Sequence, residues 1–186
     1  MGSPGRGMLS DRCELIMGGG SHVSEWNALL KKAEERGMIN LTQGYPDFEG
    51  SPIAREAAAA AITDPAVMGG RLNQYSPLAG LGSLQEALVS MYARIFGYSV
   101  DPAKELVITS SGTEAVAVAM QALVSPGDEV VLFEPFFPWY APCVRLAGGT
   151  PRFVRLSIED EWAIREDRLA EVFDPKRTKA IVVNTP

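Results

Sequence analysis

The sequence predicts an α/β fold with a parallel sheet, and two observations support this class. From about residue 106 onward, apolar runs of strand length alternate with segments of helical spacing. In one such segment, Val116, Met120 and Leu123 fall on a single helical face, as expected of a helix that covers a sheet. This alternation is typical of parallel strands joined by right-handed helical crossovers.

The composition indicates an ordinary globular protein with an acidic balance. The chain has 186 residues, of which 46% are hydrophobic, enough for a sizeable core. Its 17 basic and 23 acidic residues give a net charge of −6, which argues against nucleic acid and anionic membranes as partners. No apolar run is long enough to span a bilayer. We therefore expect neither a nucleic-acid partner nor a membrane partner.

Cysteine and histidine usage narrows the chemistry further. Cys13 and Cys143 form no metal or redox motif and are expected to be reduced thiols of a cytoplasmic protein. His22 is the only histidine, so a histidine-based triad is excluded unless this residue carries it. Residues 1–20 are Gly-rich, show no periodicity and are expected to be a disordered tail. Their arginines leave a mitochondrial destination open, although acidic residues weaken it.

Residues 21–105 are expected to form a helical, loop-rich N-terminal arm. Three helical patterns in this segment begin at or near a serine, once with a proline in the first turn and once with a capping-box glutamate. Glycines provide the stop signals. These positions are Ser24 and Gly37 for the first helix, Ser51 and Pro52 for the start of the second, and Ser83, Glu86 and Gly97 for the third.

Residues 106–186 are expected to form strands and helices in alternation. The predicted strands are residues 106–110, 129–134, 150–157 and 179–184, and the predicted helices are residues 112–125, 138–148 (a broken helix) and 165–173.

The junction SSGT, residues 110–113, is the first candidate site. In a parallel sheet, ligands bind beyond the carboxyl ends of the strands, and a helix start there offers free N–H groups to a phosphate. Hydroxyl groups of Ser110, Ser111 and Thr113 add donors, and Gly112 permits close approach. No lysine follows as in a nucleotide P-loop, and no G-x-G-x-x-G is present. The alternative is a plain helix cap.

A loop rich in aromatic residues follows the next predicted strand. The segment FEPFFPWYAP, residues 133–142, again lies at the carboxyl end of a strand. A flat ring beside a phosphate cup suggests a phosphorylated aromatic cofactor held by stacking. The alternative is that these rings only pack the core.

Together these segments resemble the fold type I pyridoxal-phosphate enzymes, specifically the class I/II aminotransferases. SSGTEA is similar to the phosphate-binding turn of that family, and GDEVVLFEPFFPWY to the segment that carries its stacking ring. NQYSPLAGLGSLQEAL resembles a further family segment, with Gln85 where arginine is frequent. INLTQGYPDFE, with Trp26 upstream, most resembles the kynurenine/glutamine aminotransferase and cysteine-conjugate β-lyase branch. The implied fold is an incomplete three-layer α/β/α large domain after a helical N-terminal arm.

The resemblance implies roles for individual residues around pyridoxal 5′-phosphate. Four would hold the cofactor within one subunit: Ser111, Gly112 and Thr113 at its phosphate, chiefly through backbone N–H groups, and Phe137 stacked on its ring. Phe136 and Trp139 are assigned to packing. The remaining implied roles are a contact of Tyr75 with the phosphate of the partner subunit in a homodimer, a backbone N–H of Gly44 for the substrate carboxylate, and a side-chain pocket lined by Trp26 and Tyr45.

Three of these assignments have a simpler alternative that the sequence leaves open. Tyr75 is also typical of a tyrosine that packs a loop, Trp26 of a helix anchor, and Gly44 of a turn glycine.

The family's chemistry needs residues that the resemblance places after residue 186. A lysine amine forms a Schiff base with pyridoxal and moves the proton, while the ring acts as an electron sink. The chain has five lysines, none at the position expected for this role, and Asn184 precedes the asparagine of the family's N-P-T-G motif. We therefore expect no catalytic residue in this chain and no activity from it alone.

The resemblance implies the N-terminal portion of an aminotransferase that exchanges an amino group between an aromatic or glutamine-like amino acid, such as kynurenine, and a 2-oxo acid. Two alternatives stay open. One is a non-catalytic truncated subunit that pairs with an intact partner, and the other is a fragment of a pyridoxal-phosphate-dependent C–S lyase.

The strand order of the family gives a further expectation. Residues 106–110 would lie on the far side of the sheet, apart from the three later strands, which would pair with one another. The last of these strands would then present an apolar edge, which favours association. We therefore expect the isolated chain to be marginally folded or prone to aggregation.

Overall fold

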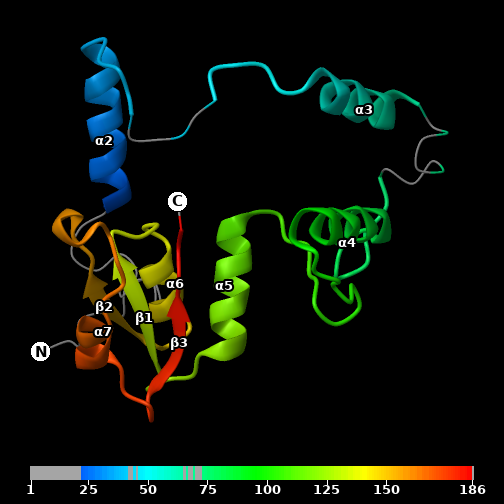
Figure 1. The fold of residues 1–186 in the computed structure, drawn as a ribbon. Helices are drawn as coiled ribbons and strands as arrows, with labels where there is room; N and C mark the ends of the chain where they lie inside the picture. Colours follow the sequence, from blue (N-terminus) through cyan, green and yellow to red (C-terminus); the bar gives the residue numbers. More distant parts are fainter. Residues whose placement is uncertain are drawn as a thin grey trace, which may run out of the picture. The chain divides into compact units, whose positions relative to one another are not determined.

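The structure is a computed structural model that describes residues 22–41, 44, 46–64, 66, 69 and 73–185. The predicted tail of residues 1–20 and Tyr45 lie outside the described residues. Two compact units divide the chain, one of Val23–Ile108 and one of Thr109–Pro186 grouped with Met1–His22. We call them the N-terminal unit and the sheet unit, and Figure 1 shows their elements.

The N-terminal unit consists of helices and connecting segments. Its helices are α2 (His22–Glu35), α3 (Pro52–Thr63) and α4 (Gly82–Phe96). Neither α3 nor α4 contains a fully buried residue. The predicted glycine stop of α4 is confirmed, because Gly97 adopts a left-handed conformation with φ 65° and donates its N–H to Ala93 O.

The predicted capping box of α4 is wrong. The helix begins at Gly82, its N-cap is Leu81, and no side chain caps it. The carbonyl oxygen of Leu81 already accepts hydrogen bonds from the N–H groups of Leu84 and Gln85, at 3.1 and 3.0 Å. Ser83 therefore lies inside the first turn, where its hydroxyl is too late to act as the cap.

The predicted strand at residues 106–110 is not present as a strand. A strand requires a neighbour paired through backbone hydrogen bonds, and in the described part of the chain the only backbone–backbone bond of this segment runs from Ile108 N to Ala79 O at 3.0 Å. Ile108 also packs on Gly80, where φ is 107° and an added Cβ would collide with the Ile108 side chain. The segment is therefore fixed against Ala79 and Gly80 rather than in the sheet.

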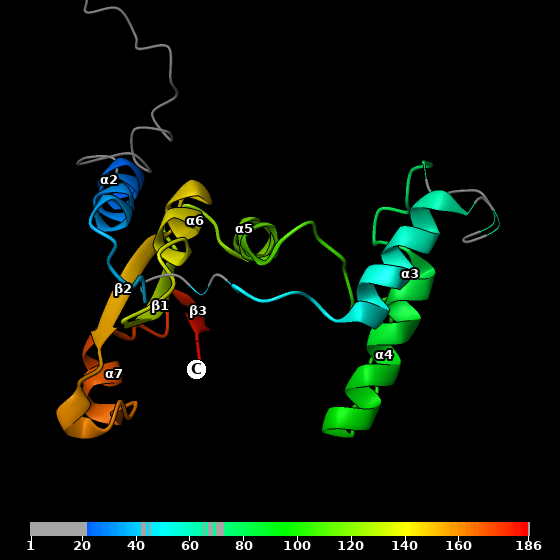
Figure 2. The same cartoon turned by 90° about the horizontal axis from the view of Figure 1, so that it is seen from above.

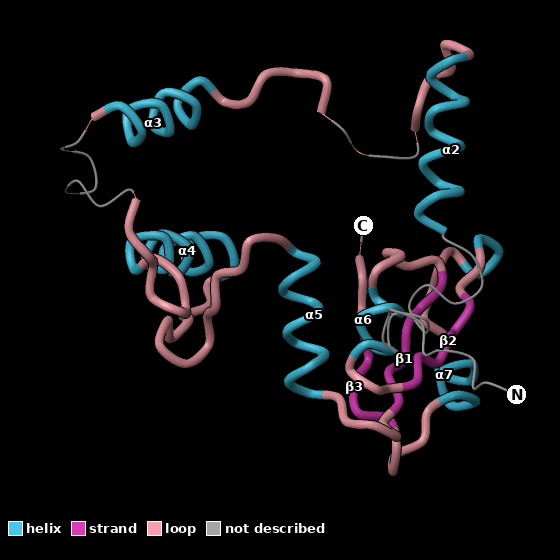
Figure 3. Tube along the Cα trace, turned by 180° about the vertical axis from the view of Figure 1, so that it is seen from behind, coloured by secondary structure: helices cyan, strands magenta, loops and turns pink. Residues whose placement is uncertain are grey.

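The sheet unit alternates helices and strands as predicted. In chain order it contains α5 (Gly112–Leu123), β1 (Glu129–Glu134), α6 (Tyr140–Leu146), β2 (Thr150–Arg155), the 3₁₀ turn η2 (Ile158–Asp160), α7 (Glu166–Val172) and β3 (Thr178–Val182). The strands are parallel in the order β2-β1-β3, so β1 is central and the predicted pairing of these three strands is confirmed. Figure 3 shows them side by side from behind.

The core depends on β1, whose side chains serve both faces of the sheet. Val130 and Leu132 face α5 and α6, in a cluster with Met120 and Val144. Val131 lies on the other face, with Phe133 and Val154, and α7 packs there. Full burial of one such side chain stabilises the fold by about 1.5–3 kcal/mol. The result is the predicted three-layer α/β/α arrangement, seen from above in Figure 2.

A charged cluster joins the amino ends of all three strands. Glu129 on β1 is only 3% exposed, and its carboxylate lies 2.8 Å from Arg177 Nη1, just before β3, and 3.5 Å from Arg152 Nε on β2. Arg177 Nε also bonds Asp174 at 2.8 Å. Since a buried carboxylate without a partner is costly, Arg177 is expected to contribute to stability.

We predict that Arg177→Met lowers the urea midpoint of the protein more than Arg55→Met does. Arg55 makes an ion pair of similar length with Glu49, at 2.7 Å, but both side chains are largely exposed. An exposed pair contributes about 0–1 kcal/mol, whereas Arg177→Met leaves Glu129 buried with only the longer contact to Arg152. Equal midpoints for the two variants would contradict a structural role for the cluster.

Candidate functional site

The start of α5 lies at the carboxyl edge of the sheet, because a short turn connects α5 to β1. In this turn Ser125 N bonds Asp128 Oδ2 at 2.8 Å, and Asp128 N bonds Ser125 O at 3.0 Å. The chain therefore reverses, and α5 runs antiparallel to β1. The beginning of the α5 helix lies near the end where β1 and β3 finish (Figure 1), which is where ligands of parallel sheets bind.

The first turn of α5 is capped by side chains. Ser111 is the N-cap, and its hydroxyl accepts a hydrogen bond from Glu114 N at 3.2 Å. The Glu114 carboxylate accepts one from Ser110 N at 2.5 Å, and Thr109 Oγ1 donates to Ser111 O at 2.9 Å. The capping alternative considered above is thus part of the structure.

This capping leaves three consecutive N–H groups free. Among the described residues, no hydrogen bond involves the backbone N–H of Ser111, Gly112 or Thr113. Ser111 and Gly112 are exposed, and a Cβ added to Gly112 would meet no described protein atom within 4 Å. Free donors at the positive end of a helix dipole, with open space before them, suit an anion such as a phosphate.

The aromatic loop follows β1 at the same edge. Phe137 is 44% exposed, and its ring contacts that of Tyr140 edge to face, with centroids 5.5 Å apart and an interplanar angle of 67°. Phe136 instead stacks on Phe153 of β2, at 5.6 Å and 5°, as expected for a packing residue. Because α5 and α6 pack against each other on one face of the sheet, the loop before α6 and the start of α5 share this edge. Phe137 is therefore a partly exposed ring in a loop at the same edge of the sheet as the free N–H groups.

The other predicted site residues belong to the N-terminal unit. Tyr75 is fully exposed, so it does not pack a loop within the described chain. Trp26 on α2 is 40% exposed. Gly44 does not have a positive φ, and the space beside it is open in the described part of the chain. A left-handed backbone therefore does not explain why a glycine occupies this position, as it would in a turn that requires glycine.

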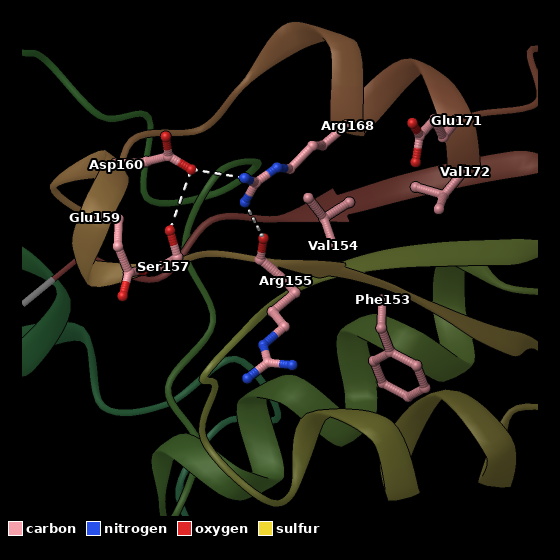
Figure 4. A pocket seen from close by; sticks show the side chains of 9 residues that line it. All are labelled: Phe153, Val154, Arg155, Ser157, Glu159, Asp160, Arg168, Glu171 and Val172. Carbon is pink, nitrogen blue, oxygen red and sulfur yellow. Dashed lines mark hydrogen bonds and ion pairs between the residues drawn. The ribbon is translucent and has the colours of Figure 1, made fainter.

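A separate cavity is present in the sheet unit. It has a volume of about 710 Å³ and lies between the end of β2 and α7 (Figure 4). Two of its charged side chains pair with each other, since Arg168 bonds Asp160 at 2.7 Å, and Arg168 also donates to Arg155 O at 3.2 Å. Ser157 also donates to Asp160, at 3.1 Å. No predicted site residue lines this cavity, and we assign the site to the start of α5, where the backbone donors are free.

Other chemistries find little support in the described residues. These residues contain no cluster of His, Cys, Asp or Glu that would hold a metal ion. Burial raises the pKa of the Cys143 thiol, which disfavours a thiolate nucleophile. None of the described helices is long and apolar enough to cross a bilayer.

Comparison with known proteins identifies the family. The sequence profile of aminotransferase class I and II matches residues 36–186, most of the chain. The chain belongs to the class I and II aminotransferases.

Two relatives and one solved structure illustrate this membership. Human kynurenine–oxoglutarate transaminase 1 is 36% identical over 177 residues, which cover 90% of the chain and 41% of that protein. The probable N-succinyldiaminopimelate aminotransferase of Mycobacterium tuberculosis is 39% identical over 151 residues, covering 81% of the chain and 36% of that protein. An aspartate aminotransferase structure from Thermus thermophilus matches with a TM-score of 0.81 at 34% identity, covering 97% of the chain and 45% of that structure. The chain thus spans less than half of each.

Enzymes of class I and II use pyridoxal phosphate, and the residues present fit this group. The free N–H groups at Ser111–Thr113 suit its phosphate, and the exposed ring of Phe137 suits its pyridine. Sequence reasoning missed Glu114, which holds the turn, and Tyr140, which contacts Phe137. The S-x-x-E spacing from Ser111 to Glu114 was a readable signal for the first, as in a capping box.

We predict that Ser111→Ala lowers the unfolding free energy of the cofactor-free protein by about 1 kcal/mol, because α5 loses its N-cap. Ser83→Ala is the matched control: Ser83 lies in the first turn of α4, but Leu81 is the N-cap there. The unfolding free energy of the Ser83→Ala protein should fall by no more than about 0.5 kcal/mol. Urea unfolding followed by circular dichroism measures both, and equal losses would contradict the capping role of Ser111.

Proposed function

We propose that the protein carrying this chain is a pyridoxal-phosphate-dependent aminotransferase, and that the sheet unit supplies part of its cofactor site. One observation carries the proposal: three free N–H groups at the start of α5 lie at the carboxyl edge of the sheet, where the loop that carries the exposed Phe137 follows β1. Family membership supports the same assignment.

In this proposal the start of α5 binds the cofactor phosphate. The backbone N–H groups of Ser111, Gly112 and Thr113 donate to the phosphate oxygens, and the helix dipole adds attraction. Glu114 holds Ser110 N and so keeps the turn in shape before the ligand arrives. Phe137 stacks on the pyridine ring and fixes its plane. The bound cofactor supplies an electron sink for amino-group chemistry.

We propose that the N-terminal unit provides the substrate side. Gly44 offers its N–H to the substrate carboxylate, and Trp26 and Tyr45 line the side-chain pocket. Tyr75 reaches the phosphate of a partner subunit in a homodimer. The full exposure of Tyr75 and Leu78, and the absence of buried residues in α3 and α4, support a surface that another subunit covers.

The proposed substrates are an aromatic or glutamine-like amino acid, such as kynurenine, and a 2-oxo acid. Similarity to human kynurenine–oxoglutarate transaminase 1 supports this class. The Mycobacterium tuberculosis relative and a methionine aminotransferase of Escherichia coli, 34% identical, make N-succinyldiaminopimelate and methionine the competing substrates to test. We propose a cytoplasmic location, with a mitochondrial one as the alternative, because Cys13 and Cys143 form no metal or redox motif.

Residues 1–186 by themselves are proposed to be inactive. The two lysines of the sheet unit, Lys176 and Lys179, lie before and at the start of β3, the edge opposite the start of α5. Neither is therefore positioned to provide an amine to a cofactor bound at α5.

The test uses the protein expressed from its complete reading frame and loaded with pyridoxal phosphate. Adding kynurenine or glutamine should change the absorption of the bound cofactor, and a 2-oxo acid added next should restore it. The 186-residue polypeptide is the control and should show no such cycle. Failure of the complete protein to retain pyridoxal phosphate, or to respond to any of the named amino acids, would refute the proposed function.

A second prediction concerns Gly112. In the complete protein, Gly112→Val should weaken pyridoxal-phosphate binding about 10- to 100-fold, the equivalent of one lost charge-assisted contact. The reason is specific to the ligand, because the added side chain would meet no described protein atom near its Cβ. The cofactor dissociation constant is measured by absorbance titration.

Gly82→Val provides the matched control for this variant. Gly82 is likewise the first residue of a helix with open space at its Cβ. Its substitution should leave cofactor affinity unchanged. An unchanged affinity in a folded Gly112→Val protein would return the turn to the role of a helix cap alone.

A further inference from the structure

One side-chain hydrogen bond joins two segments at the carboxyl edge of the sheet that are far apart in sequence. The hydroxyl of Tyr140, the first residue of α6, donates to Asn184 Oδ1 at 2.7 Å across 44 positions. Asn184 follows the end of β3. The bond therefore connects the aromatic loop with the neighbouring strand at the edge where the cofactor is proposed to bind.

Tyr140 is held from several sides. Its ring packs against the cluster formed around Val130 and Leu132, its backbone N donates to Phe137 O at 3.1 Å, and its hydroxyl bonds Asn184. Phe137, in contrast, is 44% exposed, and the described aromatic contact of its ring is the edge-to-face contact with Tyr140. The partly exposed ring of Phe137 thus contacts the ring of Tyr140, which these interactions hold in place.

We infer that Tyr140 is a positioning residue that sets the plane of the Phe137 ring, and that Asn184 locks Tyr140 in place. This inference rests on the proposed function, in which Phe137 stacks on the pyridine. An edge-to-face contact at 67° leaves at least one face of the Phe137 ring uncovered by Tyr140, and the residue is 44% exposed, which suits stacking by a flat ligand. Without Tyr140 the Phe137 side chain would have to be ordered when the cofactor binds, and binding would weaken.

A double-mutant cycle on the complete protein tests this inference. The four proteins are the wild type, Phe137→Leu, Tyr140→Leu and the double variant. Each single substitution should weaken pyridoxal-phosphate binding about three- to tenfold, the equivalent of one aromatic contact. The double variant should bind no more weakly than Phe137→Leu, because Tyr140 acts through Phe137. A Tyr140 that served only overall stability would weaken binding in both backgrounds.

A spectroscopic readout and two further variants sharpen the test. The circular dichroism induced in the absorption band of the bound cofactor reports the orientation of the cofactor ring. The Tyr140→Leu substitution should reduce this signal. Tyr140→Phe keeps the ring and loses only the bond to Asn184, so it should bind the cofactor more tightly than Tyr140→Leu; it replaces Tyr140→Leu in the cycle if that variant does not fold. Phe153→Leu removes a ring contact with Phe136, and its effect should be additive with Phe137→Leu.

The outcomes separate the inference from the function on which it rests. A wild-type protein that binds no pyridoxal phosphate overturns the proposed function and the inference with it. A wild-type protein that binds, with equal cofactor losses on changing Tyr140 in both Phe137 backgrounds, overturns the inference alone. An induced circular-dichroism signal in which the effects of changing Tyr140 and Phe137 are simply additive would also overturn the inference.

Discussion

The central position of β1 is the constraint on which the sheet unit depends. Val130, Val131 and Leu132 are fully buried and face alternate layers, so β1 holds α5 and α6 on one side and α7 on the other. Both neighbouring strands pair with it in parallel. Because parallel strands end at one edge, this pairing also decides where the candidate site lies. The Glu129 cluster binds the opposite ends of the same three strands.

At the carboxyl edge, capping and anion binding use different atoms of one turn. The hydroxyl of Ser111 and the carboxylate of Glu114 form local bonds that fix the start of α5. The N–H groups of Gly112 and Thr113 are left over because a helix cannot satisfy its own first donors. The sequence allowed two alternative interpretations of this turn, a helix cap and a phosphate-binding site, and the structure is compatible with both. A turn that its own side chains hold needs little reorganisation to receive a ligand.

Sequence reasoning succeeded where the signal is local. The apolar run of β1, the glycine stop of α4 and the small residues at the start of α5 are each readable within a few positions. It failed where a distant partner decides the outcome. The sequence of residues 106–110 predicts a strand, but a strand forms only beside a hydrogen-bonded neighbouring strand. In the described chain, the backbone of this segment instead bonds Ala79 through Ile108 N. The bond between Tyr140 and Asn184 spans 44 positions and leaves no local pattern.

The central claim is that the free N–H groups at the start of α5 receive the phosphate of pyridoxal phosphate beside Phe137. A crystal structure of the complete protein with pyridoxal phosphate tests it most directly. We predict phosphate oxygens about 3 Å from the backbone N of Gly112 and Thr113, with the pyridine ring stacked on Phe137. A cofactor phosphate bound away from α5, with the N–H groups of Gly112 and Thr113 facing only water, would contradict the account.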